Sequence, residues 1–124
     1  MRVYVVRHAE AAPGEPDELR RLTPYGREQA RRLRDELATE FDAVLSSPLL
    51  RARETAELIA ARPPEPDERL APGASETDVR AAVAGRGDTV LVVGHQPDCS
   101  RIVAALTGAE ERAFPPCAHA VVEL

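Results

Sequence analysis

Thr89-Val90-Leu91-Val92-Val93-Gly94-His95 is the stretch that decides the fold, because a strand-forming run leads directly into a glycine and a histidine. Its central residues are all apolar and do not alternate with polar ones, which is typical of a strand buried on both faces of a parallel sheet. Val3-Tyr4-Val5-Val6, followed by Arg7-His8, and Ala43-Val44-Leu45-Ser46 have the same character. We therefore expect one sheet that contains all three runs.

Helical patterns separate these strands. Thr23-Pro24 is a typical N-cap and first-turn pair and predicts a helix to about Thr39, and Ser47-Pro48 predicts a second helix to about Ala61. Ser75 followed by Asp78 resembles a capping box before a short helix. The other expected elements are a proline-rich acidic loop over 63–74, a turn over 85–88, a helix capped by Asp98 or Ser100 that runs to about Leu106, and a last strand over 118–124.

The alternation of strands and helices indicates the fold class. It predicts an α/β three-layer sandwich with a mostly parallel central sheet and helices on both faces. The chain has 124 residues, which is the length of one ordinary domain with one core. We therefore expect a single domain over residues 1–124.

The charge of the chain argues against two classes of partner. Sixteen basic and 21 acidic residues give a formal net charge of −5, and every basic residue is arginine. Nucleic-acid binders of this size carry a basic excess, and an anionic membrane surface also attracts basic chains, so neither is expected as a partner. Residues 1–62 are neutral overall, with 11 arginines and 11 acidic residues. An anion site is therefore expected in the first half.

The composition also predicts where the protein works. No apolar run approaches the length that spans a bilayer, and Val3–Val6 is too short for a signal-peptide core. Cys99 and Cys117 form no Cys-x-x-Cys pair, so two free thiols in a reducing cytoplasm are expected. The three histidines His8, His95 and His119 lie far apart without close-spaced ligand partners, so no metal is expected.

Ligands of open α/β sheets bind beyond the carboxyl ends of the strands. Arg7-His8, Ser46-Ser47 leading to Arg51, and Gly94-His95 all follow such ends. Parallel strands end at the same edge, so we expect these side chains to converge. The guanidinium group matches phosphate oxygens, and a neutral imidazole nitrogen can attack phosphorus. The set therefore predicts a phosphoryl site.

Four segments, in order along the chain, carry a family resemblance. Arg7-His8-Ala9-Glu10 resembles the Arg-His-Gly signature of the histidine phosphatase superfamily, also called phosphoglycerate-mutase-like. Leu22–Ala30 is similar to its Leu-Thr-x-x-Gly…Gln-Ala segment, and Ser46–Ala56 to its Ser-Ser-Pro-x-x-Arg-Ala-x-x-Thr-Ala segment. Val92-Val93-Gly94-His95-Gln96-Pro97 resembles the Gly-His segment in the variant of the small SixA-type phosphohistidine phosphatases.

The resemblance implies a role for each matched residue. His8 would be the nucleophile that becomes phosphorylated, and Arg7 and Arg51 would hold the phosphoryl oxygens. His95 would stabilise the transferred group, and Arg20 would bind substrate near the phosphate. Asp17 stands in the same pattern, and the sequence assigns it no role. The implied enzyme is a metal-independent hydrolase without a cofactor.

Two departures and two alternatives stay open. Ala9 replaces the usual glycine, which is harmless if the backbone there is not left-handed. No acidic residue stands where larger members carry a general acid; Glu68, Glu76 and Asp78 lie outside that context. This absence favours protein phosphohistidine, whose imidazole leaves easily, as the substrate. The alternatives are a phosphatase of small phosphomonoesters and a catalytically idle module that binds a phosphorylated ligand.

A histidine nucleophile also predicts a pH dependence. Only the unprotonated ring attacks phosphorus, so activity is expected to fall on the acid side of a histidine-like pKa. The sequence alone places that fall near the ordinary pKa of histidine.

Overall fold

The computed structural model describes all 124 residues and contains a five-stranded sheet in the order β3-β2-β4-β1-β5. The strands are β1 (Arg2–Arg7), β2 (Ala43–Ser46), β3 (Glu65–Pro66), β4 (Thr89–Gly94) and β5 (His119–Glu123). All neighbours pair in parallel except β5, which runs antiparallel to β1 at one edge. The prediction of a mostly parallel central sheet is therefore confirmed.

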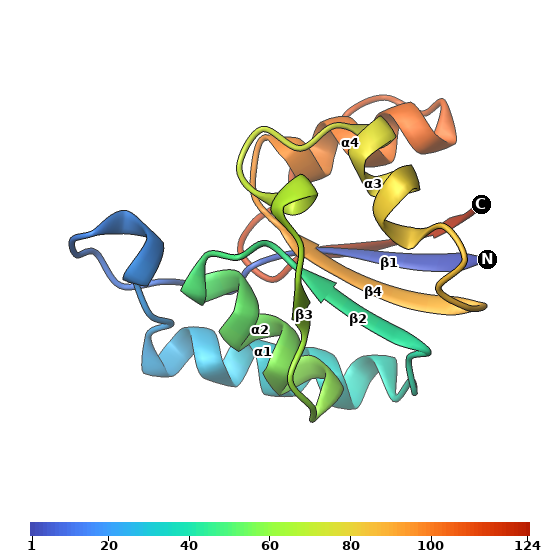
Figure 1. Cartoon of the computed structure of the whole chain (residues 1–124). Coiled ribbons are helices and arrows are strands. Elements are labelled where there is room, and N and C mark those ends of the chain that lie inside the picture. The colour runs from blue at the N-terminus through green and yellow to red at the C-terminus, as the bar shows by residue number, and fades with distance from the viewer.

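Helices cover both faces of this sheet (Figure 1). Helices α1 (Pro24–Leu37) and α2 (Leu50–Ala60) lie on one face, and α3 (Glu76–Val83) and α4 (Asp98–Thr107) lie on the other. The continuous apolar strands serve both layers because their side chains alternate between the faces. Val3 and Val5 belong to the core cluster that includes α3 and α4, whereas Tyr4 and Val6 belong to the cluster that includes α1 and α2.

Several local predictions hold and others are wrong. The Thr23 hydroxyl caps α1 by accepting from the Gly26 N–H at 2.9 Å, and Ser75 and Asp78 form the expected capping box of α3. Ser47 does not cap the second helix, which begins two residues after Pro48. The N-cap of α4 is Pro97, so neither Asp98 nor Ser100 holds that position.

The loop predicted over 63–74 contains regular structure. It holds the short edge strand β3 and the 3₁₀ turn η2 (Glu68–Leu70), where Leu70 is 2% exposed. Leu70 packs into the core cluster of α3 and α4, so a segment predicted from its prolines to be irregular contributes to the core. A second 3₁₀ turn, η1 (Asp17–Leu19), lies in the polar segment between β1 and α1.

Strand register brings the carboxyl ends of β1, β2 and β4 together. Arg7 pairs with Gly94, and Ser46 pairs with Val93. The pairing continues past the strands, because the His8 N–H donates to the Gly94 carbonyl and the Ser47 N–H to the Val93 carbonyl, each at 3.0 Å. The segment that contains η1 projects beyond this edge of the sheet (Figure 1). The residues that follow these three strands, His8, Ser47 and His95, are therefore held close together.

Candidate active site

His8 lies just beyond β1, and its ring is fixed in one tautomer. Nδ1 is 2.7 Å from the carbonyl oxygen of Ala9. A carbonyl oxygen only accepts hydrogen bonds, so this contact assigns the proton of the neutral ring to Nδ1. The lone pair then lies on Nε2. The side chain is partly exposed, so Nε2 belongs to a ring that a ligand can approach.

His95, just beyond β4, faces His8. The two ring centroids are 5.3 Å apart, and His95 is only 4% exposed. Its Nε2 is 2.7 Å from Ser47 Oγ, which also accepts the Leu49 N–H at 3.2 Å. The hydroxyl keeps its proton and a second lone pair, so it can either donate to Nε2 of His95 or accept from it. We assign the hydroxyl proton to the bond with Nε2, which leaves the proton of the neutral His95 ring on Nδ1.

Both histidines are neutral at pH 7. Burial, with smaller effects of the Arg51, Arg7 and Arg20 charges, lowers the pKa of His8 from 6.5 to about 4, although the Ala9 carbonyl opposes the shift. Burial, followed by the effects of His8 and Arg51, lowers the pKa of His95 to about 3. The positive charge of the site therefore comes from arginine, and the histidines contribute a lone pair and an N–H.

Arg51 and Arg7 each present a buried, unpaired N–H. Arg51 is the second residue of α2 and donates from Nη1 to the Asp17 carbonyl at 2.9 Å and from Nη2 to Asp17 Oδ2 at 3.3 Å. Arg7 donates from Nη1 to the Phe114 carbonyl at 3.0 Å. The Nε atom of each guanidinium is buried and has no hydrogen-bond partner in the protein. Because buried donors are nearly always paired, these two N–H groups indicate a place for an anion.

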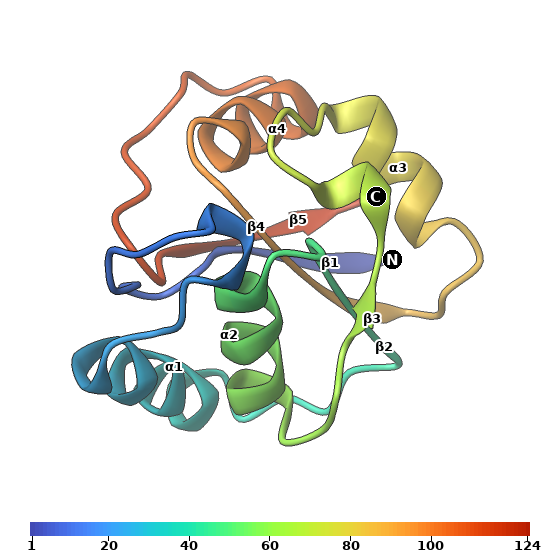
Figure 2. The same cartoon turned by 60° about the vertical axis from the view of Figure 1, so that its left-hand side comes forward.

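Arg20 joins the same group through Asp17. Its Nε donates to the Ala12 carbonyl at 2.8 Å, and its Nη1 lies 3.1 Å from Asp17 Oδ1. The Asp17 carboxylate therefore connects Arg20 with Arg51. In Figure 2 the segment that contains η1 lies beside the start of α2, in agreement with these contacts. The structure thus brings together all five residues that the sequence singled out: Arg7, His8, Arg20, Arg51 and His95.

Three further residues build the site, although the sequence assigned none of them a role there. Ser47 contacts the His95 ring, Asp17 contacts two arginines, and Thr55 Oγ1 accepts the Ala9 N–H at 3.0 Å. Ala9 is fully buried and its backbone is not left-handed, so alanine fits where the signature has glycine. The position of Ser47 directly after β2 was an available signal for its role. Asp17 lies in the 3₁₀ turn η1, and no strand end marks its position.

The two cysteines do not join the site chemistry. Both are free, and burial raises the pKa of Cys99 to about 12 and of Cys117 to about 11, so both are thiols at neutral pH. No group of three or more His, Cys, Asp or Glu side chains is placed to hold a metal ion. None of the helices combines the length and apolar character that crossing a membrane requires.

Comparison with known proteins places this fold and site in a family. Residues 3–72 match the histidine phosphatase superfamily (branch 1), and the chain belongs to that family. An uncharacterized protein of Picosynechococcus sp. is 37% identical over 113 residues, covering 79% of this chain and 68% of its own length.

The solved structures point to one branch of the family. The chain is similar to the protein histidine phosphatase SixA complexed with tungstate, with a TM-score of 0.87, 29% identity, and coverage of 100% of this chain and 88% of that one. It is also similar to the putative phosphohistidine phosphatase SixA of Agrobacterium tumefaciens, with a TM-score of 0.80, 28% identity, and coverage of 97% and 88%. The chain is therefore of the SixA type within the superfamily.

Proposed function

We propose that this protein is a phosphatase that hydrolyses protein phosphohistidine through a phosphorylated His8. One observation carries the proposal: the unpaired Nε–H groups of Arg7 and Arg51 belong to the same site as a neutral His8 whose lone pair lies on Nε2. Two buried donors bind phosphoryl oxygens, and Nε2 supplies the nucleophile. Membership of the histidine phosphatase superfamily and likeness to SixA structures support the same reaction.

In the first step His8 takes the phosphoryl group. The Nε2 lone pair attacks phosphorus in line, the Nε2–P bond forms, and the bond from phosphorus to the leaving group breaks with its electron pair on the leaving group. Arg7 and Arg51 neutralise the equatorial oxygens, and Nδ1–H of His95 donates to one of them. Arg20 adds positive charge at the rim. The Nδ1 proton of His8, held by the Ala9 carbonyl, stabilises the ring as it becomes a phosphoimidazolium.

In the second step water regenerates the enzyme. The oxygen of water bonds to phosphorus, the Nε2–P bond breaks with its electrons returning to Nε2, and a proton leaves to solvent. The products are inorganic phosphate and neutral His8. The same arginines hold the phosphoryl oxygens in both steps, so one site performs both. No metal and no cofactor takes part in the proposed cycle.

The environment of the acidic residues supports phosphohistidine over an alcohol phosphate. An alkoxide leaving group needs a proton donor, whereas a phosphohistidine protonated on its other ring nitrogen leaves as neutral imidazole. Asp78 is engaged in the α3 capping box, and Glu76 pairs with Arg80. Asp17 contacts the site arginines, but Arg20 and Arg51 hold the pKa of its carboxyl below the usual value, so it is not a proton donor at pH 7.

A substrate panel tests the proposal. Phosphohistidine protein, sugar phosphates and an activated aryl phosphate are each incubated with the wild type and with His8→Ala, with and without a chelator. We expect the wild type to release phosphate from phosphohistidine protein with and without the chelator, and His8→Ala to release none. Preference for sugar phosphates would instead support the phosphomonoester alternative, and binding without turnover would support the idle module. A cytoplasmic location belongs to the same proposal.

The pH profile is expected to extend further into acid than an ordinary histidine allows. Because the pKa of His8 is about 4, the ring stays unprotonated, and kcat/KM is expected to hold its pH 7 value to about pH 5.5 and to fall as the pH approaches 4. The profile is measured with correction for the ionisation of the substrate, and NMR titration of the His8 ring gives its pKa directly. A fall centred at 6.5 would contradict this assignment.

Ser47→Ala is expected to lower kcat by about tenfold. Without the Ser47 hydroxyl at Nε2, the proton of the His95 ring is no longer held on Nδ1, where it would be donated to the ligand. Ser47→Thr keeps a hydroxyl and is expected to recover most of the rate. Ser46→Ala is the matched control, since the Ser46 hydroxyl donates to the Ser47 carbonyl and not to a ring. Equal losses in Ser47→Ala and Ser47→Thr would show that the hydroxyl has no such role.

A further inference from the structure

Asp17 is the acidic side chain that touches the arginines of the site. Its two carboxylate oxygens divide between two partners, with Oδ1 at 3.1 Å from Arg20 Nη1 and Oδ2 at 3.3 Å from Arg51 Nη2. Its backbone carbonyl accepts from Arg51 Nη1 at 2.9 Å. Three of the contacts that orient the two guanidinium groups therefore come from one residue, and Nε of Arg51 is left unpaired.

The Asp17 carboxylate lies between the buried site and solvent. Its side chain is 62% exposed, whereas the Arg51 side chain that it contacts is 8% exposed. The hydrogen bond from Arg20, followed by the charge and hydrogen bond of Arg51, lowers the pKa of Asp17, so the carboxylate is ionised at neutral pH. The site thus has arginines around the phosphoryl position and a fixed negative charge at its mouth.

The direction of attack determines on which side of the phosphoryl group the leaving group lies. In-line attack requires the leaving group on the side of phosphorus opposite Nε2 of His8. We infer that this side faces solvent, where the Asp17 carboxylate is exposed. A leaving group with a negative charge would be repelled by the carboxylate, and one with a positive charge would be attracted. A phosphohistidine ring protonated on its free nitrogen is positively charged, whereas a phosphorylated hydroxy acid carries a negative charge on its free carboxylate.

We propose that Asp17 is a specificity-determining residue of this site: it braces Arg51 and Arg20, and its negative charge at the mouth favours cationic leaving groups and disfavours anionic ones. This inference rests on the proposed function, because it assigns the leaving-group side of the same site. The charge on the substrate beyond phosphorus then decides which phosphoryl compounds are accepted.

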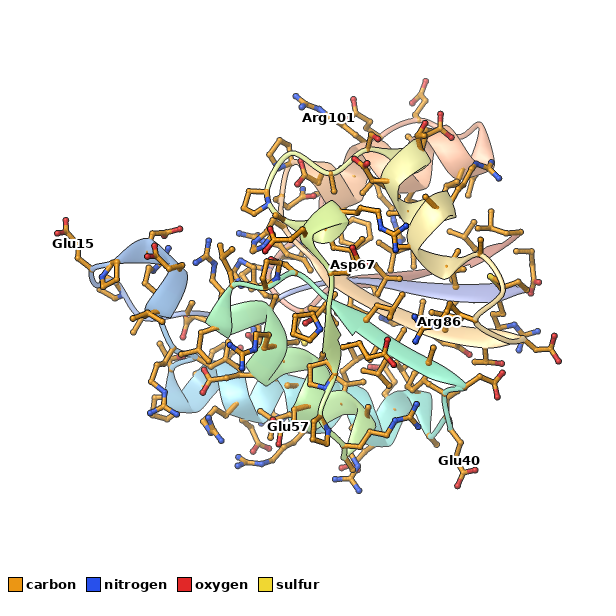
Figure 3. The ribbon with its side chains drawn as sticks, viewed as in Figure 1. Glu15, Glu40, Glu57, Asp67, Arg86 and Arg101 are labelled. Carbon is orange, nitrogen blue, oxygen red and sulfur yellow. The ribbon has the colours of Figure 1, made fainter.

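The test measures binding, so that it does not depend on turnover. Three benzylphosphonates that are not hydrolysed and differ only in the para substituent serve as probes: carboxylate, carboxamide and aminomethyl, which give charges of −1, 0 and +1. Kd is measured by calorimetry for the wild type, Asp17→Asn and Glu15→Gln. Glu15 is the matched control because it belongs to the same loop and its side chain points away from the rest of the molecule (Figure 3).

The wild type is expected to bind the aminomethyl probe most tightly and the carboxylate probe most weakly, with about fivefold between successive charges. Asp17→Asn is expected to bring the three Kd values within about twofold of one another, whereas Glu15→Gln keeps the gradient. A loss shared by all three probes measures the bracing of the arginines. A gradient that survives in Asp17→Asn, or three probes bound equally or not at all by the wild type, would overturn the inference.

Turnover separates this inference from the function on which it rests. The same preparations are assayed for phosphate release from phosphohistidine protein. If Kd depends on the charge of the probe through Asp17 but the protein shows no turnover, the proposed phosphatase activity is wrong and the role of Asp17 stands. If turnover depends on His8 but Kd does not depend on the charge of the probe, the role of Asp17 is wrong and the proposed phosphatase activity stands.

Discussion

Replacement of His8 by alanine is expected to lower turnover by at least about a thousandfold and to abolish phosphorylation of the protein, because Nε2 is the atom that forms the bond to phosphorus. The fold is expected to stay intact. The backbone of His8 donates to Gly94 and its carbonyl accepts the Cys117 N–H at 3.1 Å, and neither contact uses the ring. The variant is assayed for phosphate release and for covalent labelling by a radioactive phosphoramidate, and its folding is followed by circular dichroism.

His119→Asn is the matched histidine control. His119 lies in β5, and its side chain forms no hydrogen bond with His8 or with the site arginines, while its carbonyl accepts from Arg112 in either variant. Labelling and turnover of His119→Asn are expected to equal those of the wild type. Labelling of His8→Ala at the wild-type level would refute a histidine nucleophile at this position and would move attention to His95.

Arg51→Gln has the second-largest expected effect, a loss of about 100- to 1,000-fold in kcat/KM, because one preorganised donor to the phosphoryl oxygens is removed. Arg51→Lys keeps the charge but has no Nε fork, so it is expected to recover only part of this loss. The free energy of unfolding is expected to change little, because the lost contacts of Arg51 with Asp17 are offset by the removal of a buried cation that lies near two others and has an unpaired Nε. Steady-state kinetics and thermal unfolding measure the two effects separately.

The His8 ring reports whether Arg51 acts electrostatically. The Arg51 charge is one cause of the low pKa of His8, so Arg51→Gln is expected to raise that pKa toward its ordinary value in an NMR titration. Arg53→Gln is the control, because Arg53 lies two residues after Arg51 in α2 and is exposed. It is expected to change neither kcat/KM nor the pKa of His8. A rate loss without any change in the His8 pKa would limit Arg51 to a structural role.

Strand ends explain how much the sequence could predict. His8 and His95 directly follow the apolar runs that form β1 and β4, and the parallel pairing of those runs fixes both rings at one edge. A continuous apolar run can be recognised as a buried strand from the sequence alone, because burial of its side chains stabilises the strand whichever elements pack against it. The arginine of the adjacent helix follows from the same topology, so the central part of the site is predictable from the sequence alone.

The site residues that could not be predicted, Ser47 and Asp17, are placed by contacts with residues far away in the sequence. Serine is a residue type that commonly caps helices, but the Ser47 N–H donates to Val93 and its hydroxyl contacts His95, so the helix begins only at Leu50. Asp17 lies in a segment with two prolines and a glycine, where no periodicity indicates direction. Its place beside Arg51 results from a long-range ion pair that local patterns do not record.

The antiparallel course of β5 has a consequence for the two chain ends. The Met1 amino group donates to the Leu124 carbonyl at 3.0 Å, and the Leu124 N–H donates to the Met1 carbonyl at 2.7 Å. Both ends therefore meet at the end of the sheet where β1 begins, away from its carboxyl end, as Figure 1 shows. A short linker could join them into a ring without separating any pair of strands, and a carrier protein fused at either end would leave the mouth of the site uncovered.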